Sequence, residues 1–336
     1  MNPGWSLLSQ AAKVAREPLG DEKSLRRKAL RAVSSTAALT ALTLLGGCQW
    51  AILDPKGPIG EQEKNLILIA TALMLLVVVP VIVMTIAFAW RYRASNTKAT
   101  YKPDWEHSTA IEVVVWGIPV VIIVALAGLT WHYTHKLDPY QAIKSDTPAL
   151  NVEVVALDWK WLFIYPDQGV ASVNEVAFPV NTPVNFKVTS DSVMNSFFIP
   201  DLGSQIYAMA GMQTKVSLLA DQTGTFRGIS ANYSGAGFAK MSFKALSLSD
   251  ADFAKWVDNA RAATAALDDG SYLALSKPSE GVPVAYYGSV TPDLYTKILD
   301  MCVDAAKCTV DPKKLAALLP LSADDPLCTP ENPKGL

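Results

Sequence analysis

The chain has few of the residues from which soft-metal sites are built. Its 336 residues contain four cysteines and three histidines, and their spacing matches no zinc-binding pattern. Residues 151–301 contain neither cysteine nor histidine. Since copper in proteins is held mainly by thiolate and imidazole donors, that stretch excludes a copper site of the ordinary kind.

An excess of charge of one sign is also missing. The net charge is −2, and no stripe of basic residues interleaved with aromatic residues occurs. A nucleic acid is therefore not an expected partner.

Three of the cysteines lie near the C-terminus, at Cys302, Cys308 and Cys328. A disulfide among them is expected if this end lies outside the cytoplasm, and free thiols are the alternative. One of the three stays unpaired in either case.

Apolar residues are abundant, at 50% of the chain, and they gather in blocks. The first block, residues 32–45, follows a basic segment and is too short to span a bilayer, as is typical of a signal peptide. The sequence Leu44-Leu45-Gly46-Gly47-Cys48 follows and resembles the lipobox of bacterial lipoproteins. The resemblance implies a signal peptide over residues 1–47 and a Cys48 that carries diacylglycerol and an acyl chain such as palmitate. The alternative is a buried cysteine after a hydrophobic run.

Two longer apolar blocks, residues 66–90 and 111–131, are expected to cross the membrane. The first contains no charged residue and is long enough for a tilted span. Pro80 is expected to kink it. Trp90 and Trp131 lie at the ends of the blocks, where an interfacial aromatic belt is expected.

The connection between the blocks predicts the topology. Residues 91–110 contain a group of basic residues: Arg91, Arg93, Lys98 and Lys102. The positive-inside rule places this loop in the cytoplasm. Within the hairpin of residues 64–135, both outer ends then face the periplasm, as does the short segment 48–63 that follows the acylated Cys48. The chain is expected in the bacterial inner membrane.

Glu112 is an ionisable residue at the start of the second block. A carboxylate in lipid is costly unless it faces protein, water or the interface. One interpretation is an interfacial group that favours the helix N-terminus electrostatically. The other is a group at which protons enter from the cytoplasmic side.

Residues 150–247 have the pattern of a β-sandwich. Short apolar segments separated by Pro, Gly, Asn and Asp predict strands at 152–157, 159–165, 173–178, 184–189, 215–219, 225–230 and 240–246. Residues 248–336 form an extension in which Ser249 and Asp252 resemble a helix capping box. A second helix is expected at 292–307, followed by a loosely ordered tail.

Several motifs resemble subunit II of the haem–copper terminal oxidases. They are residues 53–57 (LDPKG), 89–93 (AWRYR), 112–116 (EVVVW), 158–161 (DWKW), 193–200 (VMNSFFIP), 203–207 (GSQIY) and 208–214 (AMAGMQT). They point to the quinol-oxidising branch, the bo-type ubiquinol oxidases, from about Cys48 to Leu246. The implied fold class is a two-helix membrane hairpin plus an all-β cupredoxin-like sandwich, with a C-terminal helical extension.

The cytochrome c-oxidising branch of this family holds a binuclear copper centre in the β-domain. Its ligands are two histidines, two cysteines, a methionine and a glutamate carbonyl. The motif places Asn195 and Phe238 at the histidines, Ser230 and Ser234 at the cysteines, Asn232 at the glutamate and Met241 at the methionine. Only Met241 is retained, so the resemblance implies a degenerate copper site and no metal bound by this chain.

The resemblance also implies a function. The chain would be the cofactor-free subunit II of a proton-pumping ubiquinol oxidase that reduces oxygen to water, and it would not be catalytic alone. Haems and copper would reside in subunit I. Subunits III and IV and membrane lipid are further expected partners, and cytochrome c is not. Glu112 matches the position at which this family has a carboxylate at the entrance of a proton channel.

Two alternatives are a membrane-anchored electron-transfer cupredoxin and a scaffolding lipoprotein. The missing thiolate and imidazole donors argue against the first. Trp159 and Trp161 are interpreted as packing residues rather than an electron relay. Met194, Met209 and Met212 are interpreted as core or interface residues.

Overall fold

The computed structural model describes residues 51–100, 102 and 104–304. These residues belong to one compact unit that begins at Ala51. The predicted signal peptide, Cys48, Cys308 and Cys328 lie outside the described residues.

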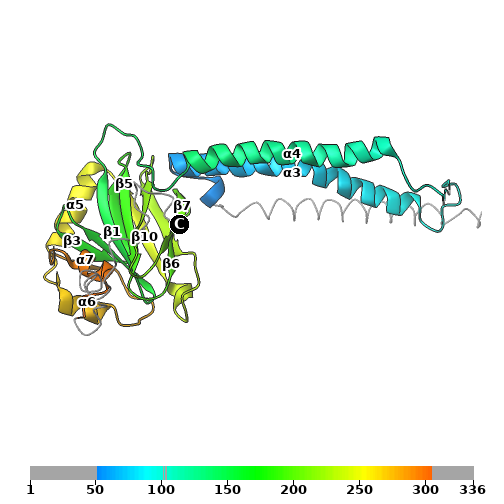
Figure 1. Cartoon of the computed structure of the whole chain (residues 1–336). Coiled ribbons are helices and arrows are strands. Elements are labelled where there is room, and N and C mark those ends of the chain that lie inside the picture. Colours follow the sequence, from blue (N-terminus) through cyan, green and yellow to red (C-terminus); the bar gives the residue numbers. More distant parts are fainter. Residues whose placement is uncertain (1–50, 101, 103, 305–336) are drawn as a thin grey trace, which may run out of the picture. The chain divides into compact units, whose positions relative to one another are not determined.

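Two long apolar helices form a hairpin. After a short 3-10 turn, η2 (Ala51–Leu53), helix α3 runs over Pro58–Arg91 and α4 over Thr109–Lys136. They lie side by side (Figure 1). Both are long and apolar enough to cross a membrane. Each contains the predicted block, and α3 also begins earlier because Pro58 suits the first turn of a helix.

The β-domain consists of two packed sheets. One has the strand order β12-β3-β2-β1-β5-β8 and the other β4-β10-β9-β6-β7. The strands of the sandwich proper are β1 (Leu150–Leu157), β2 (Lys160–Tyr165), β3 (Val170–Val173), β4 (Glu175–Pro179), β5 (Val184–Ser190), β6 (Asn195–Ile199), β7 (Gly203–Ala208), β8 (Thr214–Leu218), β9 (Gly224–Ser230) and β10 (Ser242–Leu248). Strand β1 pairs parallel with β5, and β4 pairs parallel with β10.

The core between the sheets is rich in aromatic residues. Phe197 on β6 lies at its centre, stacked on Phe243 with ring centroids 5.3 Å apart and flanked by Trp161, Phe163 and Phe186. All of these side chains are buried. Trp161 therefore packs inside the sandwich, which agrees with its interpretation as a packing residue.

Most of the C-terminal extension covers the outer face of the first sheet (Figure 1), while its first helix, Asp250–Arg261, packs on the core between the sheets. Its elements are α5 (Asp250–Arg261), β11 (Ala266–Leu267), α6 (Asp269–Leu275), β12 (Ala285–Tyr287), β13 (Ser289–Val290) and α7 (Leu294–Leu299). Leu294 and Ile298 of α7 pack with Val155 and Leu162 in a second buried cluster. Strand β12 extends the sheet by pairing with β3. Strands β1 and β2 are consequently buried on both faces.

Buried polar contacts also hold the extension. Glu175 on β4 accepts hydrogen bonds from Trp256 Nε1 at 3.0 Å and from the Tyr286 hydroxyl. Burial, and then the hydrogen bond to Glu175, raise the pKa of Tyr286 to about 12, so this phenol remains a donor at neutral pH. Lys160 Nζ donates to Lys277 O at 2.8 Å and to Ser279 Oγ at 2.7 Å.

Several predicted elements differ in their bounds. The strand predicted at 173–178 is two strands in different sheets, because Asn174 has a positive φ of 57° and turns the chain between them. The strand predicted from residue 240 begins at Ser242, after the 3-10 turn η3 (Phe238–Lys240). The helix predicted at 292–307 is represented in the described residues by the shorter α7.

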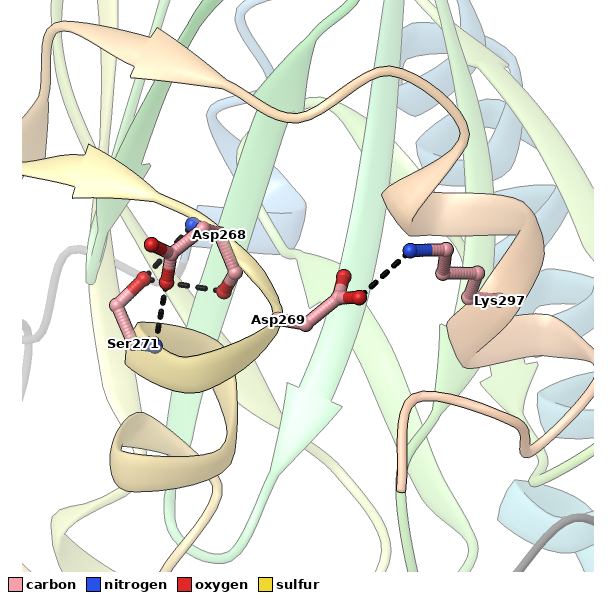
Figure 2. A network of polar contacts seen from close by, with 4 residues as sticks. All are labelled: Asp268, Asp269, Ser271 and Lys297. Atoms are coloured by element: carbon pink, nitrogen blue, oxygen red, sulfur yellow. Dashed lines mark hydrogen bonds and ion pairs between the residues drawn. The ribbon is translucent and has the colours of Figure 1, made fainter. Parts of the chain in front are cut away.

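The predicted cap at Ser249 is present, because Ser249 Oγ accepts a hydrogen bond from Asp252 N at 3.2 Å. The Asp252 carboxylate accepts from the Ser249 hydroxyl and not from the backbone, so the motif is only half of a capping box. A complete capping box occurs at α6, where Asp268 and Ser271 bond reciprocally (Figure 2). The sequence analysis did not find this helix.

We expect Asp268→Ala to lower the free energy of unfolding by about 1 kcal/mol, because an N-cap acceptor is lost. The matched control is Asp269→Asn, which removes the same charge. Asp269 makes a half-exposed ion pair with Lys297 at 2.6 Å (Figure 2), and such pairs contribute about 0–1 kcal/mol. Thermal unfolding of the purified chain checks this. A larger loss of unfolding free energy in Asp269→Asn than in Asp268→Ala would contradict the role of Asp268 as the N-cap.

Candidate functional site

The residues at the copper-ligand positions come together at one end of the sandwich. Asn195 begins β6, Ser230 ends β9, and the others follow in the loop and turn before β10. We call them the copper-position cluster: Asn195, Ser230, Asn232, Ser234, Phe238 and Met241. Asn195, Ser230 and Met241 are buried, and the others are partly buried.

Hydrogen bonds connect the polar members of this cluster. The Ser230 hydroxyl lies 3.1 Å from Asn195 Oδ1 and 3.3 Å from Asn232 O, both of which are acceptors. Asn195 Nδ2 donates to Val193 O, and Asn232 Nδ2 donates to Met194 O, each at 3.1 Å. The side chains thus satisfy each other and the local backbone.

The remaining members make weak or apolar contacts. Ser234 Oγ lies 3.9 Å from Met241 Sδ, the only contact in the cluster that involves sulfur among the described residues. Phe238 packs edge-on against Tyr233, with ring centroids 5.6 Å apart. A hydroxyl, an amide and a phenyl ring cannot replace thiolates and imidazoles as copper donors. These residues do not fit a binuclear copper centre.

Trp159 covers the loop of the cluster. Its indole Nε1 donates to Ser234 O at 3.1 Å. Its ring lies so close to Gly237 that a Cβ there would be 2.4 Å from the indole. Trp159 has a positive φ of 64°, which is rare for a bulky residue. Its interpretation as a packing residue agrees with these contacts.

Met194, Met209 and Met212 differ in how far their side chains are buried. Met194 and Met212 are 42% and 55% exposed, so neither is a core residue. Met209 is partly buried next to Ser190, which donates a backbone hydrogen bond to Met209 O at 3.4 Å. For Met194 and Met212 the interface interpretation therefore remains.

Glu112 lies in the first turn of α4, and the structure brings His107 to it. His107 Nδ1 lies 2.6 Å from Glu112 Oε1. The two residues are five positions apart, and Ser108 between them is the N-cap, in extended conformation. The contact joins the residue before the N-cap to the fourth residue of the helix, two positions that meet at many helix starts. The sequence analysis missed His107, although a histidine just before the helix and a glutamate in its first turn are a usable signal.

Polar contacts also join α3 to the β-domain. Glu63 Oε1 accepts hydrogen bonds from Ser204 N at 2.8 Å and from Ser204 Oγ at 3.1 Å. Gly60 N donates to Leu202 O at 3.0 Å. Gly203 has a positive φ of 94°, and a Cβ on it would lie 2.8 Å from Gly60 N. Glycine is therefore required where the strand approaches the helix.

The predicted disulfide among the C-terminal cysteines and the predicted lipid at Cys48 remain predictions. Cys302 follows α7 and donates its backbone N–H to Lys297 O at 2.8 Å. The other two C-terminal cysteines and Cys48 lie outside the described residues. Across the described part of the chain, no group of three or more His, Cys, Asp or Glu residues is arranged to hold a metal ion.

Comparison with known proteins gives two matches to family models. Residues 122–247 match "Cytochrome C oxidase subunit II, periplasmic domain", and residues 261–306 match "COX Aromatic Rich Motif". The second match covers about half of the extension, including the elements that pack on the outer face of the first sheet.

Curated relatives match over longer stretches. Cytochrome bo(3) ubiquinol oxidase subunit 2 of Pseudomonas putida is 62% identical over 259 residues, which are 77% of this chain and 82% of the relative. Ubiquinol oxidase subunit 2 of Acetobacter aceti is 52% identical over 277 residues, 82% of this chain and 90% of the relative. Quinol oxidase subunit 2 of Bacillus subtilis (strain 168) is 36% identical over 304 residues, 89% and 93% of the two chains.

Proposed function

We propose that the β-domain of this chain, which belongs to the ubiquinol oxidase subunit 2 family, supports the oxidase without carrying electrons. The chain is a subunit of a quinol oxidase, an oxidoreductase complex that includes other subunits. Its two apolar helices and periplasmic-type domain fit an inner-membrane subunit.

One observation carries the proposal. The copper-position cluster consists of amide, hydroxyl, phenyl and thioether groups that bond each other and the backbone. A cluster of this kind has no accessible redox state, and its serine hydroxyls stay protonated near neutral pH. The quinol must therefore deliver electrons elsewhere in the complex. We assign the haems and the catalytic copper to subunit I, and we expect subunits III and IV to be further partners.

The choice of electron donor tests this proposal. The purified complex should consume oxygen with ubiquinol and show no saturable oxidation of reduced cytochrome c. Rapid oxidation of cytochrome c, inhibited by salt as expected for a charged protein partner, would contradict the proposal. It would favour the electron-transfer cupredoxin.

We further propose that Glu112 receives protons from the cytoplasm for oxygen reduction. Support comes from its position in the first turn of α4, next to the basic loop that the positive-inside rule assigns to the cytoplasm. Its side chain is 50% exposed, so the other described residues of the chain do not enclose it. His107 Nδ1 lies 2.6 Å from Glu112 Oε1, so the carboxylate has an imidazole partner at this end of the helix.

The predicted lipid anchor leads to a separate expectation. Cys48→Ser should abolish incorporation of labelled fatty acid into the chain. The variant should nevertheless stay in the membrane fraction, because spanning helices bind far more strongly than a lipid anchor. Carbonate extraction followed by immunoblotting measures this. Labelled fatty acid retained on the Cys48→Ser chain would show that the site is elsewhere.

A further inference from the structure

A cavity lies between the sandwich and the last helix of the C-terminal extension. Helix α7 packs against the outer face of β1 and β2 (Figure 1). Residues of these two strands, of the turn after β2 and of the segment from β13 into α7 line the cavity, whose volume is about 320 Å³. This volume is at the lower end of the range for pockets that bind small molecules.

Tyr295 on α7 brings an unpartnered hydroxyl to the cavity. The residue lines the cavity and is 6% exposed, and among the described residues its hydroxyl has no hydrogen-bond partner. Buried polar groups are nearly always paired in folded proteins. Burial, and then the charge of Glu153, raise the pKa of this phenol, so it keeps its proton and can donate or accept a hydrogen bond. The hydroxyl is therefore a contact point for a ligand.

Glu153 on β1 brings a carboxylate to the same cavity. Its side chain is 15% exposed, and its ion pair with Lys187 on the neighbouring strand β5 is 3.6 Å long. The pKa of Glu153 is nevertheless raised, because desolvation by burial outweighs the attraction to Lys187. A second cation beside Glu153 would stabilise its charged form.

The rest of the lining suits a cation that carries a short apolar group. None of the described residues that line the cavity is basic, and Asp293 adds a second carboxylate. Asp167 is a further acidic neighbour of Glu153. Ile164 and Leu294 are buried apolar residues of the lining. Water needs two to four polar partners, which apolar walls do not supply, whereas an alkyl group packs against them.

We propose that this cavity binds a small primary ammonium compound. The ammonium group donates hydrogen bonds to the Glu153 carboxylate and to the Tyr295 oxygen, and the alkyl group packs on Ile164 and Leu294. The site is separate from the copper-position cluster and from Glu112, and it does not depend on the role proposed for either. The same ammonium chemistry occurs in free alkylamines and in the ethanolamine headgroup of lipids.

The test uses the full chain in phosphatidylcholine nanodiscs, titrated with n-butylammonium chloride by calorimetry and by thermal unfolding. The variants are Tyr295→Phe and Glu153→Gln. One matched control is Tyr287→Phe, the same change on β12 outside the cavity. The other is Glu280→Gln, which removes the same charge from an exposed ion pair. The control ligand is 1-butanol, which has the same alkyl group without the charge.

We expect n-butylammonium to bind the parent and to raise its midpoint of thermal unfolding, because a ligand of the folded state stabilises it. Tyr295→Phe should weaken binding about tenfold, the usual effect of losing a hydrogen bond to a charged group. It should not destabilise the unliganded chain, since the hydroxyl it removes has no partner. Glu153→Gln should weaken binding about 50-fold, because the opposite charge is lost as well. Both control variants should bind like the parent.

Three results would overturn the proposal. One is no binding of n-butylammonium up to about 10 mM, a concentration that saturates even millimolar sites. Another is equal binding of 1-butanol, which would show an apolar pocket without ammonium recognition. The third is equal affinity in the parent, Tyr295→Phe and Glu153→Gln, which would place the bound amine elsewhere.

A second series of nanodiscs distinguishes the two sources of the ammonium group. Part of the phosphatidylcholine is replaced by phosphatidylethanolamine, and the titration of the parent is repeated. If the apparent affinity for n-butylammonium falls, the lipid headgroup competes for the cavity and is its ligand. If the affinity is unchanged, the ligand is a free amine. Either result agrees with a primary ammonium site.

Discussion

Replacing Phe197 by alanine should lower the free energy of unfolding of the β-domain by about 3–5 kcal/mol, the usual cost of a large cavity at a buried aromatic residue. Phe197 is fully buried and touches four aromatic rings from both sheets, so few neighbours can move into the space. For a domain of this size, the midpoint of thermal unfolding should fall by roughly 10–20 °C. Calorimetry on the purified chain measures the shift.

The matched control for this variant is Tyr233→Ala. Tyr233 is an aromatic residue of the copper-position loop, is 74% exposed and, among the described residues, has a single ring contact, with Phe238. Its loss should cost about 1 kcal/mol or less. Equal losses at Phe197 and Tyr233 would mean that the aromatic cluster is not the core that holds the sheets together.

Glu112→Ala should slow ubiquinol turnover and proton uptake about tenfold or more, because a carboxylate that accepts protons is removed. Assembly should be intact, since the side chain is half-exposed at the start of a helix and contacts only His107 as a charged partner among the described residues. Glu112→Asp should recover part of the rate. Stopped-flow proton uptake in vesicles, together with the haem content of the purified complex, measures both effects.

The control for Glu112 is Glu106→Gln in the same loop. Glu106 is exposed and lies just before His107, and its replacement removes the same charge from the same side of the membrane. It should leave turnover within about twofold of the parent, because exposed charges contribute weakly. A normal rate in Glu112→Ala, or a similar deficit in Glu106→Gln, would remove Glu112 from the proton path.

The sequence predicted the features that depend on local composition. Uninterrupted apolar blocks identify the hairpin, because a membrane span requires such a length. Turn residues between short apolar segments identify most strands of the sandwich. The missing copper donors needed no structure, since residues 151–301 contain no cysteine and no histidine.

The features that depend on distant contacts could not be predicted. Asn174 separates β3 from β4 by a backbone turn that the apolar pattern of residues 173–178 conceals. Strands β1 and β2 were predicted as strands, but their burial on both faces depends on the extension that packs on them. Glu63 accepts from Ser204, more than a hundred residues away along the chain, and nothing local signals that pairing.

The candidate site also combines features that the sequence predicts with features that depend on three-dimensional packing. The positions of the copper ligands could be assigned from the resemblance to the oxidase family, and the structure brings them together. Their mutual hydrogen bonds and the cover that Trp159 provides depend on three-dimensional packing. His107 lies just before the helix and Glu112 in its first turn, so this contact was predictable from local spacing, although the sequence analysis did not predict it.

Copper content tests the central claim most directly. The full chain, purified without other subunits, is incubated with copper under reducing conditions, desalted, reoxidised in air and measured by metal analysis and optical spectroscopy. A sandwich with hydroxyl and amide groups at the ligand positions should retain no stoichiometric copper and show no thiolate-to-copper absorption. About two copper ions per chain, with the strong visible bands of a thiolate-bridged centre, would contradict this account.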